Sequence, residues 1–301
     1  MTRLAYITSP SYSGSTLLTV LLGAHADVGT VGEMKAQAMG DIETYRCSCG
    51  ELITECSFWK RVREGMERRG LEFDVAQFGL SFRMPDNRVV DRVLCAGVRG
   101  PLFEMGRHLL INGWPGCKMR VASTLRRNEV FVEVLAEIFG CSVVVDGSKD
   151  PIRLAYLRES DRFDISVIHV TRDGRGVANS FRRHERFSIG RGGAEFVRGH
   201  REAERVLALL PKDRTMRLIY EELCADPSKR MKEVYSFLGV DPAEGPADLG
   251  ACEQHIIGNS MRLQKLSEIR CDVRWQDELS EQDLQDFENV AGELNRALGY
   301  A

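Results

Sequence analysis

The sequence predicts an α/β fold with a mainly parallel sheet, helices on both faces and an α-rich insertion. Apolar and β-branched segments typical of buried strands alternate along the chain with segments of helical periodicity. The strand-like segments are residues 4–8, 142–146, 164–171 and 215–219. Strands separated by helices pair in parallel, and the helices then cover both faces of the sheet. Two of the strands also run directly into Gly-containing turns that open helices.

Helical periodicity is clearest in residues 58–66, 102–111, 130–139 and 230–238. Residues 40–125 lack strong strand patterns, so we expect an α-rich insertion there, within a single domain that spans residues 1–301. Near the end of the chain, a closing helix carries an apolar stripe that we expect to face the core. The residues of this stripe are Leu284, Phe287, Val290, Leu294 and Leu298.

The first strand runs into a loop of small residues that is typical of a phosphate-binding turn. Its residues are Ser11, Tyr12, Ser13, Gly14, Ser15 and Thr16, and the apolar helical segment 17–22 follows. Small residues let successive amides converge on one anion, and the helix presents its unpaired N–H groups to the same point. The Lys of the nucleotide-hydrolase pattern is replaced by Ser15, which favours a phosphorylated donor without a metal-bridged triphosphate. A plain strand-to-helix connection is the alternative.

The strand at residues 164–171 leads into a second turn, Arg172-Asp173-Gly174-Arg175-Gly176, and then into the helical segment 177–183. Arg172 at the strand end and Ser180 in the helix can face one phosphate, with the guanidinium as a bidentate donor and the hydroxyl as another. The pattern therefore predicts a second anion site.

With these two motifs in order, the sequence resembles the sulfotransferases that use 3′-phosphoadenosine 5′-phosphosulfate (PAPS). Three further pieces agree, namely Gly32-Glu33, Lys149-Asp150-Pro151 and residues 218–223 followed by Asp226-Pro227. The likeness is greatest to bacterial members and to the protein-tyrosine sulfotransferase branch. It implies a P-loop-like sulfotransferase fold and transfer of a sulfuryl group from PAPS to an acceptor hydroxyl by in-line displacement, without a required metal.

The resemblance also implies roles for individual residues. Glu33 is the expected base, provided that burial raises its pKa, and Lys149 is expected to stabilise the leaving oxygen. The first loop would hold the 5′-phosphosulfate, Arg172 and Ser180 the 3′-phosphate, and Tyr220 at a strand end would reach the donor. In the C-terminal segment, Asn259 and Arg262 are expected to add contacts.

Some of these assignments have alternatives. The family usually has Lys or Arg where this chain has Tyr12, so Lys149 or Arg262 would supply the missing charge. His255 is the alternative base. Taken singly, Glu33 fits a first-turn acid, Lys149 a solvated charge and Tyr220 ordinary packing.

Composition restricts the class of partner. The net charge of −3 argues against general nucleic-acid binding, although eight arginines lie between Arg172 and Arg201 and suit an anionic ligand. We expect a small-molecule, carbohydrate or natural-product hydroxyl as acceptor, no membrane span and a cytoplasmic location; the sequence does not predict the oligomeric state. The alternatives are a P-loop small-molecule kinase and a non-catalytic nucleotide-binding regulator.

The nine cysteines indicate reduced thiols in an intracellular chain. Three of them, Cys47, Cys49 and Cys56, lie within ten residues of one another. Three thiols with a fourth ligand from elsewhere would bind zinc, but no Cys or His follows nearby at a telling spacing. The cluster therefore fits a zinc site, a disulfide or a plain loop that closes over the acceptor.

Overall fold

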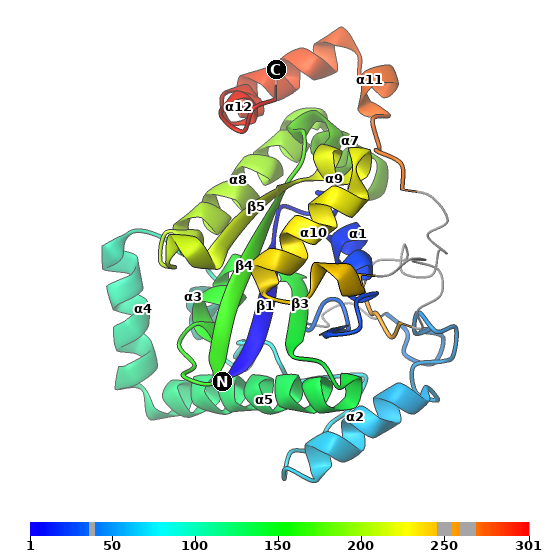
Figure 1. Cartoon of the computed structure of the whole chain (residues 1–301). Helices are drawn as coiled ribbons and strands as arrows, with labels where there is room; N and C mark the ends of the chain where they lie inside the picture. The colour runs from blue at the N-terminus through cyan, green and yellow to red at the C-terminus, as the bar shows by residue number, and fades with distance from the viewer. Residues whose placement is uncertain (36–39, 246–253, 259–268, 301) are drawn as a thin grey trace.

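A five-stranded sheet forms the centre of the computed structural model, which describes residues 1–35, 40–245, 254–258 and 269–300 (Figure 1). All strand pairs are parallel, and the order across the sheet is β2-β3-β1-β4-β5. The strands are β1 (Thr2–Thr8), β2 (Val28–Thr30), β3 (Val143–Lys149), β4 (Phe163–Thr171) and β5 (Thr215–Ile219). The predicted α/β fold is confirmed. β2 was not predicted, because three residues are too few to form a recognisable strand pattern.

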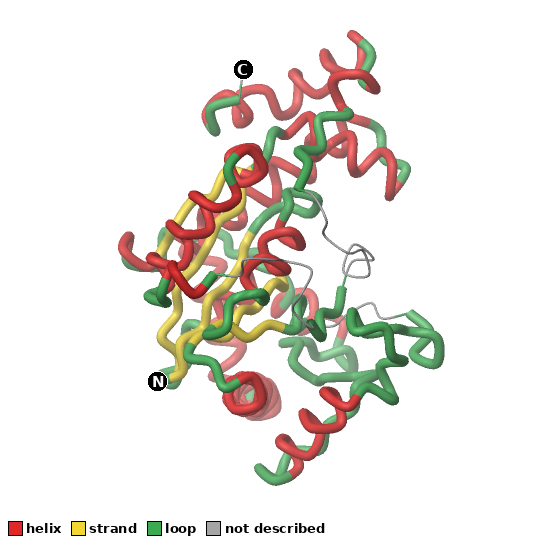
Figure 2. Tube along the Cα trace, turned by 45° about the vertical axis from the view of Figure 1, so that its right-hand side comes forward, coloured by secondary structure: helices red, strands yellow, loops and turns green. Residues whose placement is uncertain are grey.

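Helices lie on both faces of the sheet, as Figure 2 shows with strands in yellow and helices in red. The helices before β4 are α1 (Ser15–Leu22), α2 (Ser57–Glu67), α3 (Arg88–Leu94), α4 (Pro101–Gly113), α5 (Pro115–Phe139) and α6 (Pro151–Leu157). Those after β4 are α7 (Gly174–Glu185), α8 (Ile189–Leu207), α9 (Tyr220–Ala225), α10 (Pro227–Leu238), α11 (Trp275–Glu278) and α12 (Glu281–Ala297). Two short 3₁₀ turns are η1 (Lys212–Arg214) and η2 (Pro242–Glu244).

The alternation of side chains along β1 separates two cores. Leu4 and Tyr6 belong to the larger core, which contains the buried residues of α2, α5 and α6. Ala5 and Ile7 point to the opposite face and pack with α1, α9 and α10. A third core joins α7, α8 and α12 at one end of the molecule. Because both faces of the central strands are covered, these strands read as continuous apolar runs rather than as alternating ones.

The region 40–125 contains α2, α3, α4 and the first part of α5, and no named strand lies within it. The predicted helices at 58–66 and 102–111 fall inside α2 and α4. The predicted helix at 130–139 is only the last part of α5, which begins at Pro115, because charged residues interrupt the apolar periodicity earlier in that helix. That this region is one insertion in a single domain stays a prediction.

The expected apolar stripe of the closing helix is partly wrong. Phe287 is buried, but Leu284 is 36% exposed and Val290 is 46% exposed. In α12 the buried face runs through Phe287, Ala291 and Asn295, which are four residues apart. The helix contacts α7 and α8, and Leu294 and Leu298 are half-buried and pack against the same core, while Leu284 and Val290 remain in contact with solvent.

Among the described helices, none combines the length and the apolar character needed to cross a lipid bilayer.

Candidate functional site

The loop after β1 has the backbone of an anion-binding turn. Tyr12 and Gly14 both adopt left-handed conformations, with φ of 65° and 90°. Gly14 is the N-cap of α1, and no side chain caps this helix end. The hydroxyl of Ser13 is buried and has no hydrogen-bond partner among the described residues. A buried hydroxyl without a partner is costly, so a bound anion would satisfy both this group and the free amides of α1.

Gly14 cannot carry a side chain in this turn, because a Cβ there would lie 2.3 Å from Cδ2 of Tyr220. Tyr220 directly follows β5 and is the first residue of α9, so it lies at the strand end as expected. Its hydroxyl accepts a hydrogen bond from the amide of Asp272 at 3.1 Å, and burial raises its pKa well above the ordinary value. The Tyr220 ring therefore packs against the loop at Gly14. Direct contact of Tyr220 with a donor stays a prediction.

The side chain of Tyr12 contacts α7. Its hydroxyl donates to Glu185 at 3.0 Å, and its ring packs edge-on against Phe181 and stacks on His184. Burial and the Glu185 carboxylate raise the pKa of Tyr12 to about 12. Tyr12 thus contributes its backbone to the loop, while its phenol anchors the loop to α7. Of the other loop residues, Ser15 is buried, Thr16 is half-buried and Ser11 is exposed.

Arg172 lies against the same loop. Its guanidinium donates to the carbonyl of Tyr12 at 2.9 Å and to the carbonyl of Asp272 at 2.6 Å, and it stacks over the ring of Tyr220. The Arg172 guanidinium also lies 3.1 Å from the Cβ position of Gly176, whose carbonyl accepts from the Ser180 hydroxyl at 2.8 Å. Arg172 therefore contacts the first loop, whereas Ser180 lies one helical turn beyond Gly176 with its hydroxyl bonded within α7.

Asp272 was not among the residues predicted for the site, and its carboxylate lies 3.3 Å from the Arg172 guanidinium. Hydrogen bonds from Arg274 and the charge of Arg172 hold the pKa of Asp272 well below its usual range. The available signal in the sequence was an acid three residues before Trp275. The Asp272 carboxylate would compete with a phosphate for the Arg172 guanidinium.

The start of α7 is closed by the protein itself. The amide of Asp173 donates to Glu221 at 3.0 Å, that of Gly174 to Asn295 at 2.8 Å, and that of Arg175 to the Asp173 carboxylate at 2.9 Å. Three successive amides are therefore taken. A second anion site depends on the side chains of Arg172 and Ser180, without help from this helix end.

Most of the arginines after Arg172 also have acidic partners. The pairs are Arg175 with Asp173, Arg182 with Asp283, Arg183 with Glu278, and Arg198 with Glu195. Part of the basic run is thus engaged in ion pairs within the protein, which reduces the charge that it offers to an anionic ligand.

Glu33 and Lys149 form an ion pair, with 2.6 Å between Oε1 and Nζ. Lys149 ends β3 in a left-handed conformation, with φ of 65°, and Gly32 has φ of 82°. Unusual backbone of this kind in a non-glycine residue is found where the surrounding structure imposes it, often at functional sites. The expected burial of Glu33 is not found, since 35% of its side chain is exposed.

The sheet places this pair beside the first loop. β1 and β3 are neighbours, and Thr8 of β1 is in register with Lys149. On the other side, Thr8 is in register with His169 of β4, three residues before Arg172. The carboxyl ends of three adjacent strands therefore gather the loop, Lys149 and Arg172 at one edge, where open α/β sheets bind ligands. Asn259 and Arg262 lie outside the described residues.

A cavity of about 290 Å³ is lined by sequence neighbours of Glu33 and Lys149, although neither member of that pair lines it. Lys35 and Asp150, which are close in sequence to the pair, line it and form an ion pair with each other. The remaining wall comes from residues of the 40–125 region and from α6, namely Ser81, Phe82, Arg83, Leu94, Cys95, Ile152, Arg153 and Tyr156. Phe82 and Tyr156 stack with ring centroids 4.6 Å apart.

Comparison with known proteins agrees with this geometry. The chain is similar to the sulfotransferase domain of the Synechococcus PCC 7002 olefin synthase, with a TM-score of 0.54, 18% identity, and 95% and 94% of the two chains covered. It is also similar to the sulfotransferase domain from the curacin biosynthetic pathway, with a TM-score of 0.53, 15% identity, and 100% and 99% covered. These likenesses show the fold. No curated protein sequence matches the chain. The sequence model of the sulfotransferase family matches residues 5–244, and the chain therefore belongs to the sulfotransferase family.

Proposed function

We propose that this protein transfers the sulfuryl group of PAPS to a hydroxyl group of a small-molecule, carbohydrate or natural-product acceptor. The observation that carries the proposal is the juxtaposition of an open anion-binding turn at Ser13-Gly14 with the Glu33–Lys149 pair on the neighbouring strand end. Sulfuryl transfer resembles phosphoryl transfer, so it needs anion positioning, charge stabilisation and removal of one proton. The described residues offer a group for each of these tasks.

The donor would be held at both phosphorylated ends. The amides from Ser13 to Thr16 and the unpartnered Ser13 hydroxyl would bind the 5′-phosphosulfate at the positive end of α1. Arg172, together with Ser180, would bind the 3′-phosphate and exclude nucleotides that lack it. Arg172 has to give up part of its contact with Asp272 to do so.

The ion pair would separate during transfer. Lys149 would turn from Glu33 to the oxygen that bridges phosphorus and sulfur, where negative charge grows as the oxygen–sulfur bond breaks. Glu33 would then accept the proton of the acceptor hydroxyl as its oxygen bonds to sulfur. The products are the sulfated acceptor and adenosine 3′,5′-bisphosphate.

The cavity beside Lys35 and Asp150 is the proposed acceptor site. Its wall combines aromatic and aliphatic side chains with the charged groups of Arg83 and Arg153. Such a lining suits an acceptor with an apolar body and polar substituents. The predicted role of the 40–125 region in shaping this pocket rests on the five residues that it contributes.

Replacement of Glu33 by Gln tests the proposal. We expect kcat to fall by about 10²- to 10⁴-fold, the usual contribution of a general base, while the affinity for adenosine 3′,5′-bisphosphate stays within about twofold. Glu55→Gln is the control, because that side chain is 69% exposed and pairs only at the surface with Lys60. Full turnover by the Glu33→Gln variant contradicts the base assignment. Nucleotide binding by the unmodified protein without any transfer favours the regulator instead.

A P-loop small-molecule kinase is the alternative enzymatic function. It requires a cation in the first loop for a metal-bridged triphosphate, and Ser15 stands where that Lys is needed. Phosphoryl transfer from ATP to an acceptor would favour it. The cytoplasmic location stays a prediction.

A further inference from the structure

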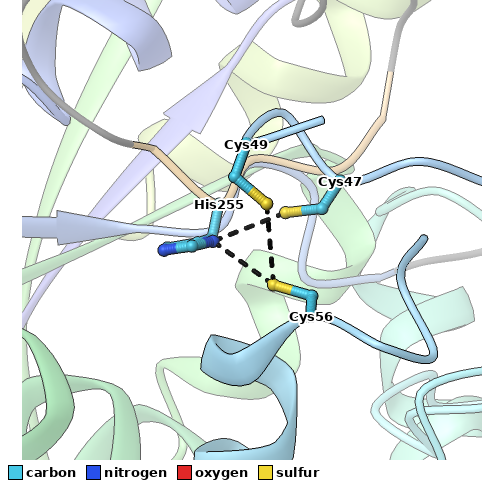
Figure 3. Close-up of side chains that lie close together, drawn as sticks. All are labelled: Cys47, Cys49, Cys56 and His255. Carbon is cyan, nitrogen blue, oxygen red and sulfur yellow. Dashed lines mark hydrogen bonds between the residues drawn. The ribbon is translucent and has the colours of Figure 1, made fainter. Parts of the chain in front are cut away.

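The cysteine cluster left open by the sequence gains a fourth member in the structure. Figure 3 shows Cys47 and Cys49 on one loop, Cys56 at the start of α2, and His255 from a distant segment, with their side chains directed at one point. The four potential ligand atoms all lie within 4.8 Å of one another. His255 is 199 residues from Cys56, so no local spacing in the sequence indicates this group.

Three distances in the cluster match those of a tetrahedral zinc site. His255 Nδ1 lies 3.6 Å from Cys47 Sγ and 3.5 Å from Cys56 Sγ, and the Sγ atoms of Cys49 and Cys56 are 3.7 Å apart. Tetrahedral zinc with metal–sulfur bonds of about 2.3 Å and metal–nitrogen bonds of about 2.0 Å separates sulfur from sulfur by about 3.8 Å and sulfur from nitrogen by about 3.5 Å. A disulfide needs its sulfur atoms about 2.05 Å apart, so the observed spacing fits shared coordination better.

The backbone around the cysteines brings their side chains together from two segments. An antiparallel bridge between Arg46 and Leu52 closes a small hairpin, which turns at Gly50 with φ of 95°. This hairpin carries Cys47 and Cys49. Cys56 is the N-cap residue of α2, and no side-chain hydrogen bond caps this helix end. The hairpin and the start of α2 thus direct three thiols to one point.

Contacts of His255 and of its neighbour Ile256 hold the His255 side chain in place. Its ring stacks on Phe58, with centroids 4.4 Å apart and planes 6° apart. The amide of the next residue, Ile256, donates to the hydroxyl of Ser48 in the hairpin at 2.8 Å. The imidazole therefore presents Nδ1 to the cysteines from a fixed direction, which makes His255 a candidate metal ligand. This arrangement argues against His255 as the alternative base.

We propose that Cys47, Cys49, Cys56 and His255 bind one zinc ion in a structural site. Four protein ligands leave no position for water or substrate, which distinguishes a structural site from a catalytic one. The ion would tie the hairpin and α2 to residues 254–258. It would take no part in sulfuryl transfer.

The site lies close to the proposed base. Ile257 pairs with Gly32 in a parallel bridge, and its amide donates to the carbonyl of Val31 at 2.8 Å. A Cβ at Gly258 would lie 3.3 Å from Cγ of Glu33. Residues 254–258 thus join the proposed zinc site to the strand end that carries Glu33, so metal loss would loosen the support of that strand end.

Metal analysis of the full-length protein tests the proposal. Protein purified without chelators is expected to contain one zinc ion per chain. His255→Ala and Cys47→Ser should each reduce the zinc content severalfold. Cys95→Ser should not, because Cys95 is exposed and lies outside the cluster. A parallel measurement avoids variants that fail to fold: cobalt exchanged into the unmodified protein should show the intense visible spectrum of a tetrahedral thiolate site.

Three outcomes would overturn the proposal. The first is unmodified protein that contains no zinc and gives no tetrahedral cobalt spectrum. The second is a Cys49–Cys56 disulfide, detected by mass spectrometry in protein purified without reductant. The third is full zinc content in both ligand variants. None of these results bears on whether the protein transfers sulfuryl groups.

Discussion

The turns after β1 and after β4 look alike in sequence and differ in structure. Both follow a central parallel strand and lead into a helix, and both contain glycine. After β1, the N-cap of α1 is Gly14, without a side-chain cap, and the Ser13 hydroxyl has no partner among the described residues. After β4, the N-cap of α7 is Asp173, whose carboxylate accepts from the amide of Arg175. One helix end is open to an anion, and the other is closed.

The residue at the N-cap therefore decides whether a strand-to-helix turn is available to a ligand. An Asp at this position supplies the negative charge that the helix end favours, so a second anion is repelled. A Gly leaves the amides free and tolerates the left-handed backbone that directs them to one point. The second turn therefore contributes to a donor site only through its side chains.

The largest expected effect comes from Gly14→Ala in the open turn. The left-handed φ costs about 1–2 kcal/mol for a non-glycine residue, and the new Cβ would also displace the Tyr220 ring. We expect affinity for adenosine 3′,5′-bisphosphate, measured by calorimetry, to fall about 100-fold. The control is Gly70→Ala, where φ is 73° but nothing lies within 4 Å of the Cβ position. Equal affinity in both variants would mean that the turn does not bind the donor.

Arg172→Gln is expected to have the next largest effect. Loss of a charge-assisted contact of about 1.5–3 kcal/mol should weaken binding of the bisphosphate roughly 10- to 100-fold. Binding of a nucleotide without the 3′-phosphate should change much less. Arg175→Gln is the matched control, because that guanidinium is engaged by Asp173 and stacks on Trp275. A uniform loss for both nucleotides would point to damage to the loop that Arg172 contacts through Tyr12.

Asp173→Ala tests the closed turn, because Asp173 is the N-cap of α7. Loss of the cap should lower the free energy of unfolding in urea by about 0.5–2 kcal/mol, with donor affinity unchanged. Asp226→Ala removes the N-cap contact of α10, at 3.0 Å from the amide of Lys229, and serves as the comparison at a distant helix. If Asp173→Ala weakens donor binding while Asp226→Ala does not, the closed turn has a role in binding after all.

Ser13→Ala should give the smallest effect and a distinctive combination of signs. In the free protein the hydroxyl is buried without a partner, so its removal should leave the free energy of unfolding unchanged or raise it slightly. Donor binding should weaken by about 0.5–1.5 kcal/mol, because one hydrogen bond to the phosphate is lost. Thermal unfolding with and without the bisphosphate measures both. A destabilised free protein with unchanged binding would show that Ser13 is structural.

The sequence predicted the sheet, the first loop and the residues at the strand ends because these are local patterns. The open turn is formed by consecutive residues, and Asp173 can be recognised from the sequence as an N-cap. What was missed depends on tertiary contact. The degree of exposure of Glu33 depends on how the folded chain surrounds it. The contact of Asp272 with Arg172 and the approach of His255 to the cysteines join segments that are far apart in the chain. No periodicity records such contacts.

A crystal structure of the protein with adenosine 3′,5′-bisphosphate is the most direct test of the contrast between the two turns. The expected result is a 5′-phosphate within hydrogen-bond distance of the Ser13 hydroxyl and the amides from Gly14 to Thr16. The 3′-phosphate should lie on Arg172, and no phosphate should contact the amides of Gly174 and Arg175. A phosphate seated on the start of α7, with the turn after β1 empty, would contradict the assignment.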